Sequence, residues 1–230
     1  MPATLSGSLR DALHLEIPPV AVAFLEAAPE GIDRIDAAVP AGCAFWRLAR
    51  ERVFYTEAAD HTGCAIGVLT MGLEAGPDLQ REAGELVTEM EALGYLQPGE
   101  ATALPSVRSS PTAIAYGPLD RFPLDPQIVL VTSTPEQAMV LAEAAGAVAL
   151  NGQPLRLHGR PACAAIPRAI ESTRLEVSLG CAGMRTFTAV EPGMLVSILP
   201  GPALSGLAER LMAVASANES MRAHYAQKLG

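Results

Sequence analysis

Residues 113–145, AIAYGPLDRFPLDPQIVLVTSTPEQAMVLAEAA, are the stretch that decides the fold class. Two short runs rich in apolar residues, Ala113–Tyr116 and Ile128–Thr132, predict strands on either side of a proline-rich bend. Thr134 and Pro135 are residue types that cap and begin a helix, and this helix is expected to run to about Ala145. Strands that alternate with a capped helix predict an α/β fold.

The rest of the chain extends this pattern to mixed sheets with flanking helices. Leucine, valine and methionine recur at helical spacing in Asp78–Leu93, which predicts an amphipathic helix, and a long helix is expected over residues 203–229. Asn151-Gly152 predicts a hairpin turn. We expect residues 1–230 to form a single globular unit. Further strands are predicted at Val20–Leu25, Val53–Thr56, Thr186–Val190 and Met194–Leu199.

Composition restricts the classes of partner. Half of the residues are apolar and 18% are charged, so the chain can bury a large core. A net charge of −9 argues against nucleic acid as a partner. No apolar run reaches the roughly 18 residues of a membrane span, and residues 1–10 do not resemble a secretory signal. We therefore expect a cytoplasmic protein with reduced thiols and no membrane contact, and its apolar composition is compatible with a homodimer.

The cysteines occupy four similar settings. Cys43, Cys64, Cys163 and Cys181 are each followed by alanine and preceded by glycine or alanine. The first two and the last two form pairs of similar spacing, which predicts an internal duplication with halves at about residues 15–95 and 111–200. A pseudo-twofold axis between such halves would bring the four thiols together.

Four converging thiols predict a metal site. Thiolates at helix starts and beside glycine suit an iron–sulfur cluster, and small neighbouring residues leave room for one. The favoured hypothesis is a redox or electron-transfer protein that holds a 4Fe-4S cluster through all four cysteines and serves a redox partner protein. Zinc and haem are the alternative cofactors. Arg47, Arg160 and Arg185 lie near cysteines in the sequence and could bind an anionic cluster or substrate, or else pair with surface carboxylates.

Two further functions stay open. One thiol could be a nucleophile, either Cys64 with His61 nearby or Cys181, in a thiol-dependent enzyme or a small-ligand-binding protein. His61 and Arg185 are then the catalytic candidates, although a loop histidine is more often simply exposed. Alternatively, the four cysteines could hold a structural zinc in an interaction module. The cysteines could also simply be small core residues. No common nucleotide-binding or hydrolase motif occurs in the sequence. The sequence therefore does not decide whether the protein is an enzyme.

The segments around the cysteines resemble a known family. Gly159–Pro167 and Ser178–Arg185, together with Pro19–Val22 and Asp60–Gly67 upstream, are similar to domain of unknown function 169. The resemblance covers about residues 15–200. It implies a soluble protein of bacteria or archaea whose marked positions include these cysteines, and it implies no particular activity.

Overall fold

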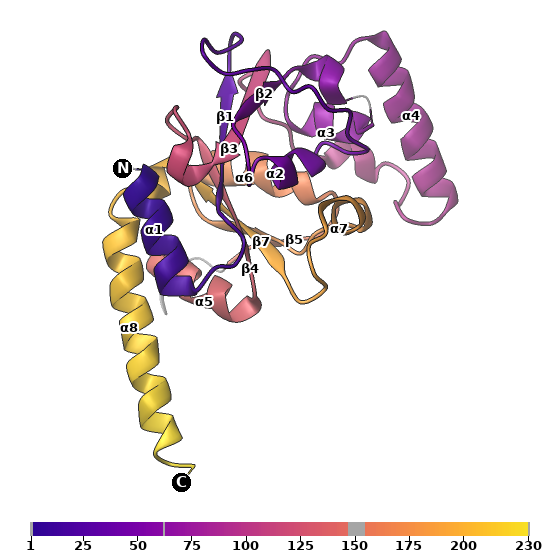
Figure 1. Cartoon of the computed structure of the whole chain (residues 1–230). Helices are drawn as coiled ribbons and strands as arrows, with labels where there is room; N and C mark the ends of the chain where they lie inside the picture. Colours follow the sequence, from indigo (N-terminus) through magenta and orange to yellow (C-terminus); the bar gives the residue numbers. More distant parts are fainter. Residues whose placement is uncertain (1, 62, 147–154, 230) are drawn as a thin grey trace.

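A mixed sheet of seven strands lies at the centre of the computed structural model, which describes residues 2–61, 63–146 and 155–229 (Figure 1). The strand order is β2-β3-β1-β4-β7-β6-β5. Neighbouring strands are antiparallel except for β5 and β6, which are parallel. The strands are β1 Val20–Leu25, β2 Phe54–Thr56, β3 Ala113–Pro118, β4 Ile128–Ser133, β5 Leu157–His158, β6 Glu176–Ser178 and β7 Leu195–Pro200.

Helices cover both faces of this sheet, which confirms a mixed α/β fold. The α-helices are α1 Pro2–Leu13, α2 Ala44–Leu48, α3 Ala65–Thr70, α4 Pro77–Ala92, α5 Pro135–Ala144, α6 Ala165–Ser172, α7 Ala182–Thr188 and α8 Leu207–Ala226. The 3-10 turns are η1 Ala58–His61, η2 Glu100–Ala103, η3 Leu119–Arg121, η4 Ala162–Ala164 and η5 Gly201–Leu204.

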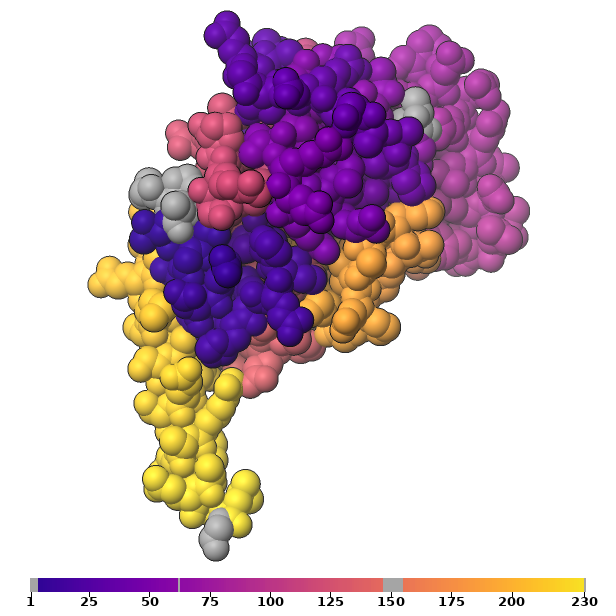
Figure 2. Space-filling view, in the orientation of Figure 1, coloured from indigo at the N-terminus to yellow at the C-terminus, as the bar shows by residue number. Residues whose placement is uncertain are grey.

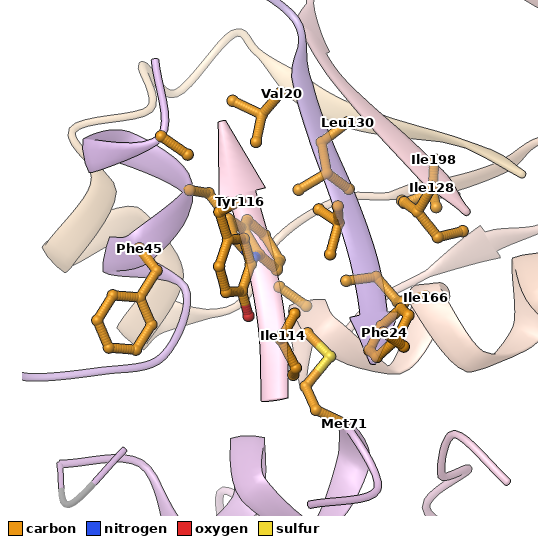
Figure 3. Packing of buried hydrophobic residues seen from close by; sticks show 14 of the residues in the cluster. Val20, Phe24, Phe45, Met71, Ile114, Tyr116, Ile128, Leu130, Ile166 and Ile198 are labelled. Carbon is orange, nitrogen blue, oxygen red and sulfur yellow. The ribbon is translucent and has the colours of Figure 1, made fainter. Parts of the chain in front are cut away.

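Alternate residues of the central strands contribute to two apolar clusters, one on each face of the sheet, because successive side chains of a strand point to opposite faces. Val20 of β1 belongs to a cluster with Phe45 of α2 and Ile166 of α6 (Figure 3). Its neighbour Ala21 belongs to the cluster on the other face, where α1, α5 and α8 pack. The central strands are therefore buried on both sides, as their continuous apolar sequences require.

Local sequence signals explain two of the helices well. The Thr134 hydroxyl accepts a hydrogen bond from the Gln137 backbone N–H at 3.3 Å, and the Gln137 side chain accepts one from the Thr134 backbone N–H at 2.8 Å. This reciprocal capping box begins α5 at the predicted residue. The predicted helix at 78–93 is also confirmed, since α4 spans Pro77–Ala92 with proline at its first turn.

The predicted strand at Thr186–Val190 is wrong, because residues 182–188 form α7. The Cys181 sulfur caps this helix by accepting a hydrogen bond from the Met184 backbone N–H at 3.4 Å, and the Met184 side chain is fully buried. The cap and this burial outweigh the weak strand preference of threonine and phenylalanine. The predicted Asn151-Gly152 hairpin turn lies outside the described residues.

The C-terminal helix α8 projects from the body of the molecule (Figure 2). Leu207, Leu211 and Ala215 in its first half are buried, whereas Met221 and Tyr225 in its second half are exposed. Among the residues that the structure describes, none of the helices is both long and apolar enough to cross a membrane.

Candidate functional site

A cavity of about 720 Å³ lies beside the sheet face that carries Tyr116. Its wall is assembled from segments far apart in the sequence: the turn before α2, the η1–α3 region, α4 and the chain after it, β3, and the starts of η4 and α7. Most of the lining side chains are apolar, and Met71, Met90 and Met184 are among them. The fold therefore builds one apolar chamber from both halves of the chain.

All four cysteines border this cavity, and each is half-buried. Cys43, Cys64 and Cys181 are the N-cap residues of α2, α3 and α7. Cys163 lies in η4, directly before α6. The expectation that the cysteines stand at helix starts is confirmed, and the structure brings them to the wall of one chamber.

The iron–sulfur hypothesis is nevertheless wrong. Within residues 2–61, 63–146 and 155–229, which include every cysteine, no group of three or more His, Cys, Asp or Glu side chains could hold a metal ion. The thiols border a shared space without gathering around one point in it. The expected electron-transfer role loses its basis, and so does the redox partner protein that depended on it. The same finding counts against the structural zinc module, which needs four ligands around one ion.

Burial also disfavours the thiolate form of three of the cysteines. Burial, with the nearby Cys64 and Cys181 adding to it, raises the pKa of Cys43 from 9.0 to about 12. Burial likewise raises the pKa of Cys64 and of Cys163. The thiolate is the nucleophilic form, so these three side chains are neutral and weakly nucleophilic at neutral pH.

His61 is a buried residue of the cavity wall, not an exposed loop histidine. Its side chain is 1% exposed, and its Nε2 lies 3.0 Å from the Thr56 hydroxyl oxygen. Its ring packs edge-on against Phe45, with 4.8 Å between the ring centres. Burial lowers the pKa of His61 from 6.5 to about 4, so the imidazole is neutral. Its second nitrogen, Nδ1, is buried and has no hydrogen-bond partner.

Tyr116 is a second polar group of the wall, and the sequence reasoning treated it only as a strand residue. Its ring stacks on Phe54 and lies beside Phe45 (Figure 3). Burial raises the pKa of Tyr116, so the phenol is protonated. The Thr56 hydroxyl lies near enough to lower that pKa, but no hydrogen bond of normal geometry satisfies the buried Tyr116 oxygen. A lone tyrosine within an otherwise aliphatic strand was the available signal.

Two glycines let the backbone approach these groups closely. A Cβ atom at Gly42 would lie 3.0 Å from Nδ1 of His61, and one at Gly67 would lie 2.8 Å from the Cys64 sulfur. Neither glycine has a positive φ, so the space around them, not their conformation, requires glycine. The alternation of small residues with cysteine in the sequence thus reflects tight packing around the thiol and the imidazole.

The three candidate arginines have different surroundings. Arg160 borders the cavity, pairs with Glu100 at 3.2 Å and lies over the Tyr95 ring. Arg47 is exposed on α2 and is not part of the cavity lining. The guanidinium of Arg185 donates hydrogen bonds to the backbone carbonyls of Leu179, Glu191, Pro192 and Met194. Arg185 therefore stabilises the loops on either side of α7. Of these three arginines, only Arg160 lines the cavity.

Helix α4 forms the outer wall of the cavity. Leu86, Met90 and Leu93 lie along its apolar stripe and line the chamber. Ala83 is the fully buried residue of the helix among those described, and α4 packs mainly on α3. The apolar stripe that predicted this helix therefore faces the core at Leu79 and Ala83 and the chamber at Leu86, Met90 and Leu93.

The comparisons identify a family and nothing beyond it. The model of the family DUF169, described as an uncharacterised ArCR, matches residues 8–210. This match confirms the resemblance found around the cysteines. Neither a curated protein nor a solved structure matches the chain.

Proposed function

We propose that this chain, which belongs to the family DUF169, binds a small and largely apolar molecule in the cysteine-lined cavity. The cavity itself is the observation that carries the proposal. Its volume of about 720 Å³ falls within the range of about 300–1,000 Å³ that is typical of small-molecule sites. An apolar chamber with a few buried polar groups is the usual composition of such a site.

The wall favours an uncharged ligand body. Among the described residues that line the chamber, Glu89 and Arg160 carry a charge, and Arg160 is already paired with Glu100. The imidazole of His61 and the thiol of Cys43 are neutral at neutral pH. Among the described lining residues, an anionic ligand group would meet only the paired Arg160 and a cationic one only Glu89, which is exposed. The desolvation of a buried charge would oppose binding.

The protonation states favour binding over thiol chemistry. A nucleophilic cysteine needs a lowered pKa or a basic partner, whereas burial raises the pKa of Cys64 and lowers that of His61. The two side chains therefore do not form a thiolate–imidazolium pair.

We also propose that the two halves derive from one duplicated unit, with the first half extended to Pro118. The sheet order supports this idea, because β2-β3-β1 is followed by β4-β7-β6 and the central pair β1–β4 is antiparallel. A twofold axis between β1 and β4 would exchange β1 with β4, β2 with β6, and β3 with β7. Each unit then has one cysteine before its second strand and one after it.

The unpaired thiols support a cytoplasmic location. All four cysteines are free in the structure, although they border one cavity. Thiols that share a chamber persist in the reduced state most readily in a reducing compartment.

A fluorescent probe tests the proposed binding function. N-phenyl-1-naphthylamine is uncharged, apolar and brightly fluorescent only out of water, so we expect saturable binding to the wild-type protein. Met90→Trp should abolish most of this signal, because it places an indole in the chamber. Thr88→Trp is the matched control: Thr88 lies on the exposed side of α4 and does not line the cavity.

The outcomes separate binding in the cavity from binding elsewhere. Equal fluorescence with both tryptophan variants would place the probe outside the chamber and refute the proposal. Absence of saturable binding to a folded wild-type protein would refute it as well. Circular dichroism of each variant verifies that the fold is retained.

A further inference from the structure

We infer that the bound molecule carries a hydroxyl group, alcohol or phenol, which donates a hydrogen bond to Nδ1 of His61. This inference rests on the proposed function and specifies the chemical class of its ligand. Nδ1 is buried without a partner on the wall of the cavity, and a buried polar atom of this kind is costly unless something bonds to it. A ligand hydroxyl would supply the missing bond.

The hydrogen bonds of the other ring nitrogen, Nε2, and of its neighbour Thr56 determine whether Nδ1 needs a donor or an acceptor. The Thr56 hydroxyl donates to the backbone carbonyl of Ile114 at 3.5 Å. We assign the donor role in the 3.0 Å pair between this oxygen and His61 to Nε2, because the Thr56 proton is directed at the Ile114 carbonyl. In a neutral imidazole the other nitrogen is left with a lone pair. Nδ1 is therefore an acceptor, and it requires a donor from the ligand.

Gly42 packs closely against Nδ1. Gly42 borders the cavity, and a Cβ atom there would stand only 3.0 Å from Nδ1. Any larger residue would press on the imidazole and displace Nδ1. The backbone of Gly42 has no positive φ, so alanine is conformationally acceptable there and would act by shifting the ring.

Tyr116 supplies a second polar point for the same ligand. Tyr116 borders the cavity, and its phenol oxygen is fully buried and lacks a hydrogen-bond partner. Both His61 and Tyr116 pack against the ring of Phe45, which places the two groups in the same part of the chamber. The phenol can donate to an oxygen of the ligand, while Nδ1 accepts from its hydroxyl.

The test uses two probes of the same shape, 2-naphthol and 2-methylnaphthalene, which differ by a hydroxyl in place of a methyl group. Their affinities are measured by displacement of N-phenyl-1-naphthylamine. In His61→Phe, we expect the affinity for 2-naphthol to fall about tenfold, as for the loss of one buried hydrogen bond, while 2-methylnaphthalene binds as before. Gly42→Ala should reduce 2-naphthol binding selectively in the same way. Gly84→Ala, where a Cβ atom meets nothing within 4 Å, is the control and should change neither affinity.

The outcomes distinguish the two levels of the claim. If neither probe binds the wild-type protein, the proposed function fails, and the inference fails with it. If both probes bind and His61→Phe and Gly42→Ala change the two affinities equally or not at all, binding stands and the hydroxyl assignment is overturned. Nitrogen-15 NMR of His61 provides a readout that needs no variant: a resonance of an unprotonated Nδ1 is expected, and a protonated Nδ1 would overturn the inference.

Discussion

Replacement of Gly67 by alanine should expose how tightly α3 is packed against the Cys64 thiol. The added Cβ atom would lie 2.8 Å from the Cys64 sulfur and 3.6 Å from its Cβ atom. A sulfur 2.8 Å away is far inside ordinary contact, so the thiol or the helix must shift. Such overpacking of a well-packed site costs about 1–3 kcal/mol in the free energy of unfolding.

The same substitution should change sign when the sulfur is absent. In a Cys64→Ala background the atom at 2.8 Å is gone, and the nearest remaining atom lies 3.6 Å away. Gly67 lies inside α3, where alanine is favoured over glycine by about 0.5–1 kcal/mol. The preference for alanine is the same in both backgrounds and cancels, so the coupling free energy between positions 64 and 67 equals the overpacking cost, about 1–3 kcal/mol.

Equilibrium urea denaturation of the wild type, both single variants and the double variant measures this coupling. Gly84→Ala in the same two backgrounds is the matched control, and its effect should be independent of Cys64 because nothing lies within 4 Å. If Gly67→Ala changes the free energy of unfolding equally in both backgrounds, within about 0.5 kcal/mol, the close contact between α3 and the thiol does not exist.

Three other predictions follow from buried and capping groups. Burial lowers the pKa of His61 from 6.5 to about 4, so between these pH values the unfolded chain binds a proton that the folded chain does not. The free energy of unfolding should therefore fall as the pH drops through this interval. His61→Phe should flatten this dependence in urea titrations. The pKa of Cys43 is raised to about 12, so at neutral pH this thiol should react with iodoacetamide far more slowly in the folded protein than in the urea-unfolded protein. Mass spectrometry follows the reaction, and rapid alkylation of the folded protein would contradict the assigned burial. Thr134→Ala removes one half of the capping box and should lower the free energy of unfolding by about 1 kcal/mol, a loss that Thr134→Ser should largely spare.

Local signals in the sequence predicted much of the fold. The strand at Val20–Leu25 and the capped start of α5 appear where composition and spacing place them. These elements depend on nearest neighbours and on apolar periodicity, both of which can be read along the chain. The segment 186–190 was misassigned because a helix cap provided by a cysteine sulfur and the burial of Met184 overrode residue preferences.

The cysteines show where sequence reasoning stops. Four similar settings predicted a shared location, and the structure places all four on one cavity wall. Similar settings do not determine the distances between sulfur atoms, because these depend on how separate loops pack around the sheet. Burial then raises the pKa of Cys43, Cys64 and Cys163, and burial of this kind cannot be read from neighbouring residues.

The same limit applies to His61 and Tyr116. Asp60 and Gly63 around His61 suggested an exposed turn, whereas packing against Phe45 buries the ring. Tyr116 lies on a predicted strand, but which face it occupies follows from its pairing with Phe54 in β2. The unsatisfied nitrogen and oxygen of these residues became visible only when the chamber around them was assembled.

NMR of the methionine methyl groups tests the occupation of the cavity most directly. The chain contains methionines on the cavity wall, Met71, Met90 and Met184, and exposed ones on α5 and α8, Met139 and Met221. With methyl-labelled protein and N-phenyl-1-naphthylamine, we predict shift changes and contacts between probe and protein at the three wall methionines and none at the exposed ones. Contacts confined to Met139 or Met221, or unchanged spectra in the presence of excess probe, would contradict the claim that the chamber is a binding site.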